Sequence, residues 1–265
     1  MLKVADFKRA KINYSDSGKG RVIVLLHGFM ESLDIWDDFS AQLSKTYRVL
    51  CIDLPGFGQS PCIGYVHSME LLAQCVKSVL DKEGLRRYVL IGHSMGGYAA
   101  MAFADFFPDN LKGLGLFHSS ALADSEEKKK SREQAISVVK KDPRRYIQLF
   151  FSPLFAPSTA AQFSASIKAL EKRAASISNK AIVYALEGMK DRKRRDWILE
   201  LTKFPVLFII GKHDPTFPVE TILKQAELVK DPYVLLLENS GHMGFIEERD
   251  VTLKAVRKFV RKCYK

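Results

Sequence analysis

The chain lacks the long apolar segments that membrane proteins and secreted precursors carry. Its longest apolar runs, such as Val22–Leu26 and Pro205–Ile210, are far shorter than the roughly 20 residues that cross a bilayer. The N-terminal stretch MLKVADFKRA is interrupted by charged residues and has no apolar signal-peptide core. We therefore expect a cytoplasmic protein with no transmembrane segment.

Cysteine is scarce, and its spacing suggests no metal site. The four cysteines form no CxxC pair and no Cys/His spacing suited to zinc. Three of them fall in or beside segments predicted as strand or helix, which favours buried thiols over disulfides. We expect no metal and no organic cofactor.

Repeats, low-complexity linkers and nucleic-acid-binding signatures are also missing. No zinc finger, aromatic RNA-binding motif or helix-turn-helix pattern supports binding to a nucleic acid. With 47% hydrophobic and 27% charged residues, the composition is that of a globular protein and excludes a disordered chain. A length of 265 residues allows one large domain, with room for an insertion, or two small ones.

The net charge of +11 is concentrated in one segment. Residues 122–195 carry 17 basic and 8 acidic side chains, a net charge of +9. We favour solvated helix faces as the explanation. The alternative is a weak contact between this segment and an acidic partner or an anionic membrane surface.

Short apolar segments alternate with segments of helix length in the rest of the chain. Strands are expected at 2–7, 11–14, 22–26, 47–52, 87–91, 111–117, 206–210 and 233–237, and helices at 35–43, 69–80, 98–107, 220–229 and 251–260. This alternation predicts a mostly parallel, doubly wound α/β sheet. Residues 122–195 look mainly helical, so we expect a core of residues 1–121 and 196–265 with a helical, basic cap insertion at 122–195.

One motif indicates nucleophilic catalysis. Gly92-His93-Ser94-Met95-Gly96 matches G-x-S-x-G between a predicted strand and a predicted helix. A serine there lies on a tight turn that projects its hydroxyl from the sheet. Side chains at positions 92 and 96 would clash in that turn, which explains both glycines.

A serine hydroxyl needs a base, and the base needs an orienting carboxylate. His242 follows the last predicted strand, at the carboxyl edge of the sheet where α/β proteins keep their sites. Asp214 follows the strand at 206–210 in the same way. We predict that Ser94, Asp214 and His242 are the catalytic residues.

The other histidines are weaker candidates for the catalytic base. His93 lies inside the turn, where it is poorly placed to reach its neighbour, and His27 suits a loop role. His67 begins a helix away from any strand end. His118, at the end of the strand at 111–117, could touch a substrate or be an ordinary surface histidine, and both alternatives stay open.

The oxyanion of an acyl-transfer intermediate would need two amide donors. One is the N–H of Met95, the residue after the nucleophile. The other is expected in the loop after Val22–Leu26, where we assign it to the N–H of Phe29.

At these residues the chain resembles the α/β-hydrolase superfamily, and within it the compact, cap-bearing serine hydrolases of carboxylesterase type. The resemblance covers nearly the whole chain and includes the order serine, acid, histidine. It implies an eight-stranded sheet with one antiparallel strand, a helical cap over the site, and a structural role for Asp53. The matching pieces are His27-Gly28-Phe29, residues 53–60 (DLPGFGQS), Gly92–Gly97, Gly211–Asp214 and Gly241-His242.

Two details distinguish the chain from other branches of the superfamily. The nucleophile is serine and not the aspartate of dehalogenases and epoxide hydrolases. The oxyanion loop is HGF and not the HGGG of some lipases. Four phenylalanines of the cap could line an acyl pocket, although packing of the cap onto the sheet is the favoured explanation: Phe150, Phe151, Phe155 and Phe163.

These observations predict a serine esterase that cleaves a carboxylic ester of a small molecule through an acyl-enzyme. The same triad would serve a carbon–carbon hydrolase acting on a vinylogous diketone, or a lactonase. A hypothesis of another class is a ligand receptor or scaffold with the same fold and little turnover. The sequence does not determine the oligomeric state.

Overall fold

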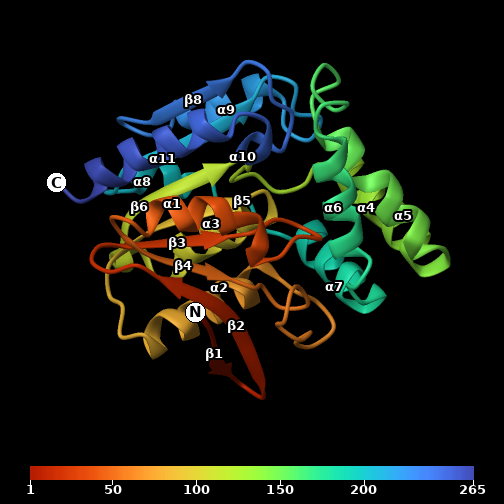
Figure 1. The fold of residues 1–265 in the computed structure, drawn as a ribbon, viewed down its shortest axis with the longest axis horizontal. Helices are drawn as coiled ribbons and strands as arrows, with labels where there is room; N and C mark the ends of the chain where they lie inside the picture. The colour runs from red at the N-terminus through yellow and green to blue at the C-terminus, as the bar shows by residue number, and fades with distance from the viewer.

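Eight strands form one sheet in the order β1-β2-β4-β3-β5-β6-β7-β8 (Figure 1). The computed structural model describes residues 1–265. Strand β2 is antiparallel to both of its neighbours, and all other pairs from β4 to β8 are parallel. The mostly parallel eight-stranded sheet is confirmed. The strands are β1 (Leu2–Phe7), β2 (Ala10–Ser17), β3 (Val22–Leu26), β4 (Arg48–Ile52), β5 (Tyr88–His93), β6 (Leu111–Phe117), β7 (Val206–Gly211) and β8 (Tyr233–Leu237).

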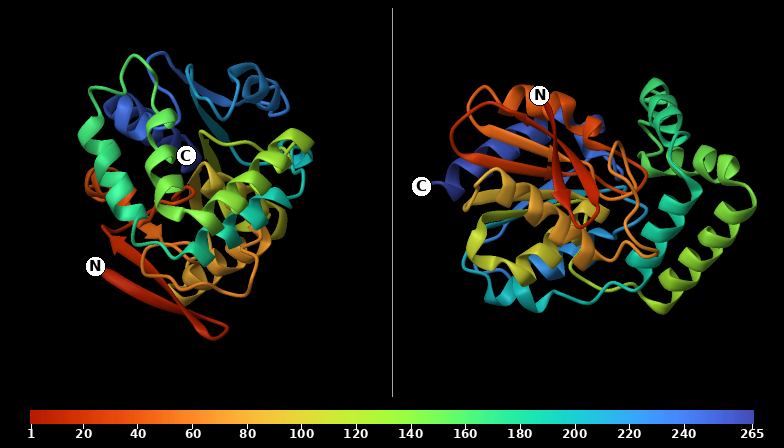
Figure 2. Two further views of the ribbon diagram at one scale, coloured as in Figure 1. Left: turned by 90° about the vertical axis from the view of Figure 1, so that its right-hand side faces the viewer. Right: turned by 90° about the horizontal axis from the view of Figure 1, so that it is seen from below.

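Helices cover both faces of the sheet. Helices α1 and α11 lie on one side of it, and α2 and α3 lie on the other (Figure 2). The α-helices are α1 (Asp37–Leu43), α2 (Met69–Lys82), α3 (Met95–Phe106), α4 (Glu126–Lys141), α5 (Pro143–Phe150), α6 (Ser164–Ala174), α7 (Asn179–Lys190), α8 (Trp197–Leu201), α9 (Val219–Ala226), α10 (Gly244–Glu247) and α11 (Arg249–Cys263). Three 3₁₀ turns add η1 (Leu33–Trp36), η2 (Pro108–Asn110) and η3 (Ser152–Leu154).

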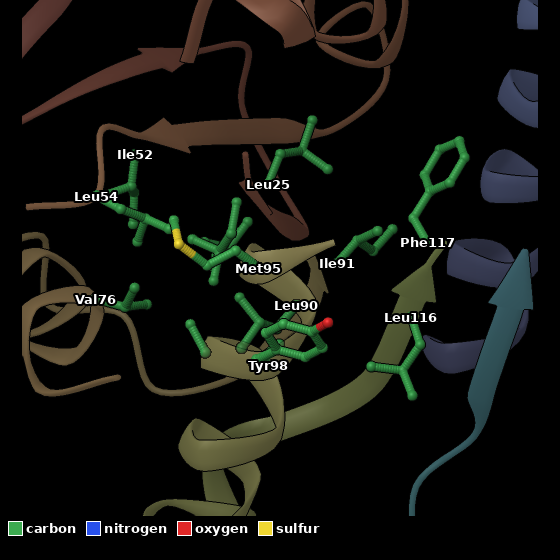
Figure 3. Packing of buried hydrophobic residues seen from close by; sticks show 14 of the residues in the cluster. Leu25, Ile52, Leu54, Val76, Leu90, Ile91, Met95, Tyr98, Leu116 and Phe117 are labelled. Carbon is green, nitrogen blue, oxygen red and sulfur yellow. The ribbon is translucent and has the colours of Figure 1, made fainter. Parts of the chain in front are cut away.

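The central strands are apolar on both faces because both faces are covered. Every residue of β3, β5 and β7 is buried, so these strands lack the alternation of a half-exposed sheet. Figure 3 shows Ile52 of β4 and Leu90 of β5 on the face of the sheet that carries Val76 of α2 and Met95 and Tyr98 of α3. The burial fixes the carboxyl ends of the strands, where the candidate site lies.

The structure differs from the prediction mainly at helix ends. Helix α3 begins at Met95, directly after Ser94, and so includes three residues before the apolar segment at 98–107. The helix expected at 35–43 is divided into η1 and α1, because the Asp53 carboxylate accepts the Leu33 N–H at 2.8 Å and fixes an earlier turn. The short helices α8 and α10 were not predicted.

Helices α4 to α7 are inserted between β6 and β7 and lie together at one end of the molecule (Figures 1 and 2). Not all of the basic residues in this segment are solvated. Arg132 and Arg192 both pair with the buried Asp124. Arg195, which is 3% exposed, lies 2.6 Å from Glu70 in α2. No helix is both long enough and apolar enough to cross a membrane.

Candidate active site

Ser94 occupies a strained turn between β5 and α3. Its φ of 50° and ψ of −115° are unusual for a residue with a side chain. A Cβ on Gly92 would lie 2.2 Å from the Gly96 carbonyl carbon, and one on Gly96 would lie 2.5 Å from the His27 carbonyl oxygen. Only glycine fits at both positions, so the two glycines make the turn possible.

The Ser94 backbone is held from β6. The Ser94 N–H donates to the Phe117 carbonyl at 2.9 Å, and the Ser119 hydroxyl donates to the Ser94 carbonyl at 2.8 Å. Ser94 is partly exposed, whereas the residues on either side of it are buried. The turn therefore leaves Ser94 accessible to solvent, whereas its two neighbours are buried.

Asp214 and His242 are in direct contact. His242 Nδ1 lies 2.8 Å from Asp214 Oδ2, and both side chains are almost fully buried. The other oxygen, Oδ1, accepts the backbone N–H groups of Thr216 and Phe217 at 2.7 and 3.2 Å. Burial opposes ionisation of Asp214, but the attraction of His242 and the side-chain contacts with His118 and His242 lower the pKa of the carboxyl below its usual range. The carboxylate therefore accepts the Nδ1–H, which leaves Nε2 free to act as a base.

The loop that carries His242 is tied to the inserted segment. The His242 N–H donates to the Leu154 carbonyl at 2.6 Å. One oxygen of Glu247 accepts the Gly241 N–H at 2.9 Å, and the other accepts the Ala156 N–H at 2.8 Å. The position of the base therefore depends on contacts across two parts of the chain.

The predicted amide donors lie beside the start of α3. The close approach of Gly96 to the His27 carbonyl brings the first turn of α3 against the loop that holds Phe29. The Phe29 N–H donates to no protein group, and Met95 opens α3, where amides lack intrahelical acceptors. The Phe29 ring packs edge-on against Phe150 of α5, with centroids 5.4 Å apart.

A buried ion pair that sequence reasoning missed joins three loops of the site. His93 Nδ1 lies 3.0 Å from Glu31 Oε2, and its Nε2 lies 3.0 Å from the His242 carbonyl oxygen. The same Glu31 oxygen accepts the Gly28 N–H at 2.5 Å. His93 was predicted to be poorly placed to reach Ser94, and both of its ring nitrogens contact other groups, Glu31 and the His242 carbonyl. Nothing in the local sequence marks Glu31, since a glutamate after a strand is ordinarily exposed.

The charge state of this pair follows from its surroundings. Burial disfavours the charged form of His93, but the Glu31 carboxylate outweighs it and raises the pKa of His93. Burial likewise opposes ionisation of Glu31, but His93 lowers its pKa. An imidazolium with two N–H groups can donate to both Glu31 and the His242 carbonyl.

The sequence left the role of His118 open, and the structure shows that it is not a surface histidine. It is 2% exposed and has a left-handed backbone with φ of 47°. Its Nε2 accepts the Gly244 N–H at 3.1 Å, and its Nδ1 lies 3.3 Å from Asp214 Oδ2. One side-chain nitrogen of His118, one of His242 and one carboxylate oxygen of Asp214 all lie within 4.8 Å of one another.

The remaining expectations concern supporting residues. Asp53 accepts the side-chain N–H of Asn13 at 2.7 Å and the backbone N–H of Gln59 at 2.9 Å, which confirms its structural role. His27 and His67 are both buried and each accepts a backbone N–H, from Leu54 and Ile63 respectively. Neither histidine contacts Asp214 or His242.

Comparisons with known proteins identify the fold family. The family model for the alpha/beta hydrolase fold matches residues 21–249. A 2-hydroxy-6-oxononadienedioate/2-hydroxy-6-oxononatrienedioate hydrolase of Pseudomonas sp is 26% identical over 94% of this chain and 91% of its own length. A pimeloyl-[acyl-carrier protein] methyl ester esterase of Pseudoalteromonas atlantica is 27% identical, with 88% and 92% covered.

Among solved structures, a thermophilic esterase from Thermogutta terrifontis superposes with a TM-score of 0.93 and 27% identity, and all of both chains is covered. The match therefore includes the inserted helices as well as the sheet. Together with the family match over most of the chain, it establishes that this protein belongs to the α/β-hydrolase fold family.

Proposed function

We propose that this protein is a serine hydrolase that cleaves carboxylic esters of small molecules through Ser94, His242 and Asp214. The observation that carries the proposal is the 2.8 Å contact of His242 Nδ1 with Asp214 Oδ2, in a loop adjoining the strained Ser94 turn. A serine on such a turn, a histidine and an ionised carboxylate are the three groups that activate a hydroxyl for acyl transfer.

The reaction follows from these positions. His242 Nε2 takes the Ser94 hydroxyl proton while Oγ attacks the ester carbonyl, and Asp214 stabilises the imidazolium that forms. The proton passes to the leaving alkoxide, which departs as the alcohol and leaves an acyl-serine. Water, deprotonated by the same imidazole, then attacks the acyl carbon and releases the acid.

Two amides would bind the oxyanion. The Phe29 N–H belongs to the loop after β3 and the Met95 N–H to the first turn of α3, two segments that meet where Gly96 approaches the His27 carbonyl oxygen. Each such donor stabilises a tetrahedral intermediate by about 2.7–4 kcal/mol. No metal or organic cofactor is needed for this sequence of steps.

We further propose that residues 122–195 act as a cap on a core of residues 1–121 and 196–265. The contact between Phe150 and Phe29, and the hydrogen bond between the Leu154 carbonyl and His242, support this assignment. Phe151 and Phe155 are fully buried, which favours packing over a role in an acyl pocket. Phe150 is only partly buried beside the oxyanion loop, so it is the phenylalanine best placed to touch an acyl group.

A second candidate is hydrolysis of a carbon–carbon bond in a vinylogous diketone. The similarity to the Pseudomonas hydrolase over 94% of the chain favours it. The similarity to two esterases, one of them aligned over the whole chain, supports the ester as the preferred class.

The test is a panel of p-nitrophenyl esters of increasing acyl length, measured with the wild type and with Ser94→Ala. We expect a clear optimum of kcat/KM at short or medium length and no turnover by the variant. Preference for diketones over all esters would move the assignment to the second candidate. Tight ligand binding with hardly any turnover would favour a receptor, and full activity of Ser94→Ala would end the proposal.

A further inference from the structure

A buried histidine that takes no part in the proposed reaction lies against its acid and its base. The His118 ring is 5.6 Å from the His242 ring, between centroids, and its side chain is fully buried. It follows β6 directly, so it comes from a different strand than Ser94, Asp214 or His242. Its contacts therefore connect loops that are distant in sequence.

The hydrogen bonds of His118 determine its tautomer. The Gly244 N–H points at Nε2 from 3.1 Å, so Nε2 must carry a lone pair. The proton of a neutral ring is then on Nδ1, which lies 3.3 Å from Asp214 Oδ2. Burial lowers the pKa of His118 to about 4, which agrees with a neutral ring at pH 7.

Asp214 Oδ2 is consequently shared by two imidazoles. The contact with His242 is 2.8 Å long, and the contact with His118 is longer and less well aligned. A second N–H near the same oxygen draws off part of its negative charge. Less charge is then available to stabilise the His242 imidazolium.

The backbone around His118 is built to bring the ring this close. A Cβ on Gly244 would lie 2.6 Å from His118 Nε2, so the turn after His242 accepts the ring only with glycine at that position. His118 also holds a positive φ of 47°, a conformation that costs free energy for most side chains. Strain at a residue that touches both members of a catalytic pair indicates a role in aligning them.

We propose that His118 is a positioning residue. It fixes the Asp214 carboxylate relative to the His242–Gly244 turn, and it reduces the basicity of the Asp214–His242 pair. The proposal rests on the proposed function, because it assigns His118 a task within that triad. The titratable groups that face its ring are Asp214 after β7, His242 after β8 and His93 at the end of β5.

Two variants separate the two contacts. In His118→Asn the side-chain amide sits near the former Nδ1, so a donor toward Asp214 is kept, and asparagine tolerates a positive φ. In His118→Gln the amide reaches the former Nε2 position, and the donor toward Asp214 is lost. His67→Gln is the control, because His67 is an equally buried, neutral histidine that lies outside the site.

The readout is the pH profile of kcat and kcat/KM for a p-nitrophenyl ester. For His118→Gln we expect a kcat about tenfold lower, a KM within a factor of two, and an acid-limb pKa raised by about half a unit. The pKa rises because Oδ2 regains charge and favours the protonated His242. His118→Asn keeps the wild-type acid limb, and His67→Gln changes neither kcat nor the acid limb.

A wild-type kcat and acid limb in His118→Gln would overturn the proposal. So would a loss of activity in His118→Gln that comes with thermal destabilisation and an unshifted acid limb, since that is the signature of a merely structural residue. If Ser94→Ala retains full ester turnover, the proposed function fails, and this result is distinct from either outcome at His118.

A measurement on the unaltered protein avoids any question of folding. In ¹⁵N-histidine NMR we expect His118 to be neutral with the proton on Nδ1 from pH 6 to 8. A protonated ring, or a proton on Nε2, would contradict the geometry on which the proposal depends.

Discussion

At the residue scale, the site depends on a few side chains whose surroundings set their protonation. Asp214 accepts two backbone N–H groups on one oxygen and the His242 N–H on the other. Although burial opposes its ionisation, His242 and His118 lower its pKa, so it is ionised. His93 is driven toward its charged form by Glu31, whereas His118 is held neutral by burial. Three neighbouring histidines thus have three different environments, and only His242 forms a hydrogen bond with the Asp214 carboxylate.

Replacing Asp214 by asparagine tests the orienting role of the carboxylate. The amide would present either an N–H or a weaker acceptor to His242 Nδ1, so the imidazole would lose its correct tautomer. We expect kcat to fall by about 10⁴ while the thermal unfolding midpoint changes little. A kcat within tenfold of the wild type would show that Asp214 does not orient the base.

Replacing Glu31 by glutamine tests the buried pair with His93. It would leave a buried charge without its partner, so we expect a loss of about 3–5 kcal/mol in the free energy of unfolding at pH 7. Glu31 has a lowered pKa, so its contribution is present above its unfolded pKa and is lost as pH falls through its folded value. His93 has a raised pKa, so its contribution is lost as pH rises through its folded value.

The stabilisation by this pair is therefore greatest between the unfolded pKa of Glu31 and the unfolded pKa of His93, and it is lost as the pH passes the folded pKa of either group. Urea unfolding of the wild type and Glu31→Gln at several pH values measures the difference between their free energies. A difference that does not vary with pH would contradict the ion pair.

At the element scale, the site is assembled from the loops that follow β3, β5, β6, β7 and β8. Strands β3, β5 and β7 could be predicted because each is a short apolar run that is buried on both faces. The Ser94 turn could be predicted as well, since a side chain at either of its glycines would clash with nearby backbone atoms. Glu31 and His118 could not be assigned, because their partners lie far away in sequence and no periodic pattern marks them.

Helix α10 escaped prediction for a related reason. It spans only Gly244–Glu247 and contains a glycine, so its propensity signal is weak. Its existence is explained by Glu247, which accepts N–H groups from its own loop and from the inserted segment. Tertiary hydrogen bonds, and not local preference, account for this element.

Replacing Glu247 by glutamine should loosen the link between the His242 loop and residues 152–159. The amide cannot accept at both ends, so we expect faster hydrogen exchange in that segment and a loss of about 1.5–3 kcal/mol in the free energy of unfolding. Glu238→Gln is a matched control, because Glu238 is exposed and pairs only with Lys212 at the surface. Equal exchange in the two variants would contradict the link.

At the scale of the whole molecule, the positive charge has two different roles. Some of the excess in residues 122–195 lies on exposed helix faces, as the sequence suggested. Arg192 is instead buried and pairs with Asp124 of the same segment, whereas the buried Arg195 pairs with Glu70 of α2 and so ties the segment to the core. Composition revealed the excess charge, but only the fold separates solvated residues from those in buried ion pairs.

Replacing Asp124 by asparagine should therefore destabilise the protein strongly. Burial opposes ionisation of Asp124, but Arg132 and Arg192 lower its pKa. Its contribution to stability is therefore fully present above its unfolded pKa and is lost as the pH falls through its folded pKa. We expect a loss of about 3–5 kcal/mol at pH 7, because two arginines would lose a buried partner. Glu126→Gln, which breaks an exposed pair with Lys129, should lower the free energy of unfolding far less, because an exposed ion pair is screened by solvent. Similar urea midpoints for the two variants would contradict this assignment.

The most direct test of the central claim is labelling of the nucleophile. A fluorophosphonate probe is incubated with the wild type and with Ser94→Ala, and the modified peptide is identified by mass spectrometry. We predict stoichiometric labelling of the wild type on the peptide that contains Ser94, and no labelling of the variant. Labelling of a different serine, or undiminished labelling of Ser94→Ala, would contradict the proposal that Ser94, His242 and Asp214 form a working active site.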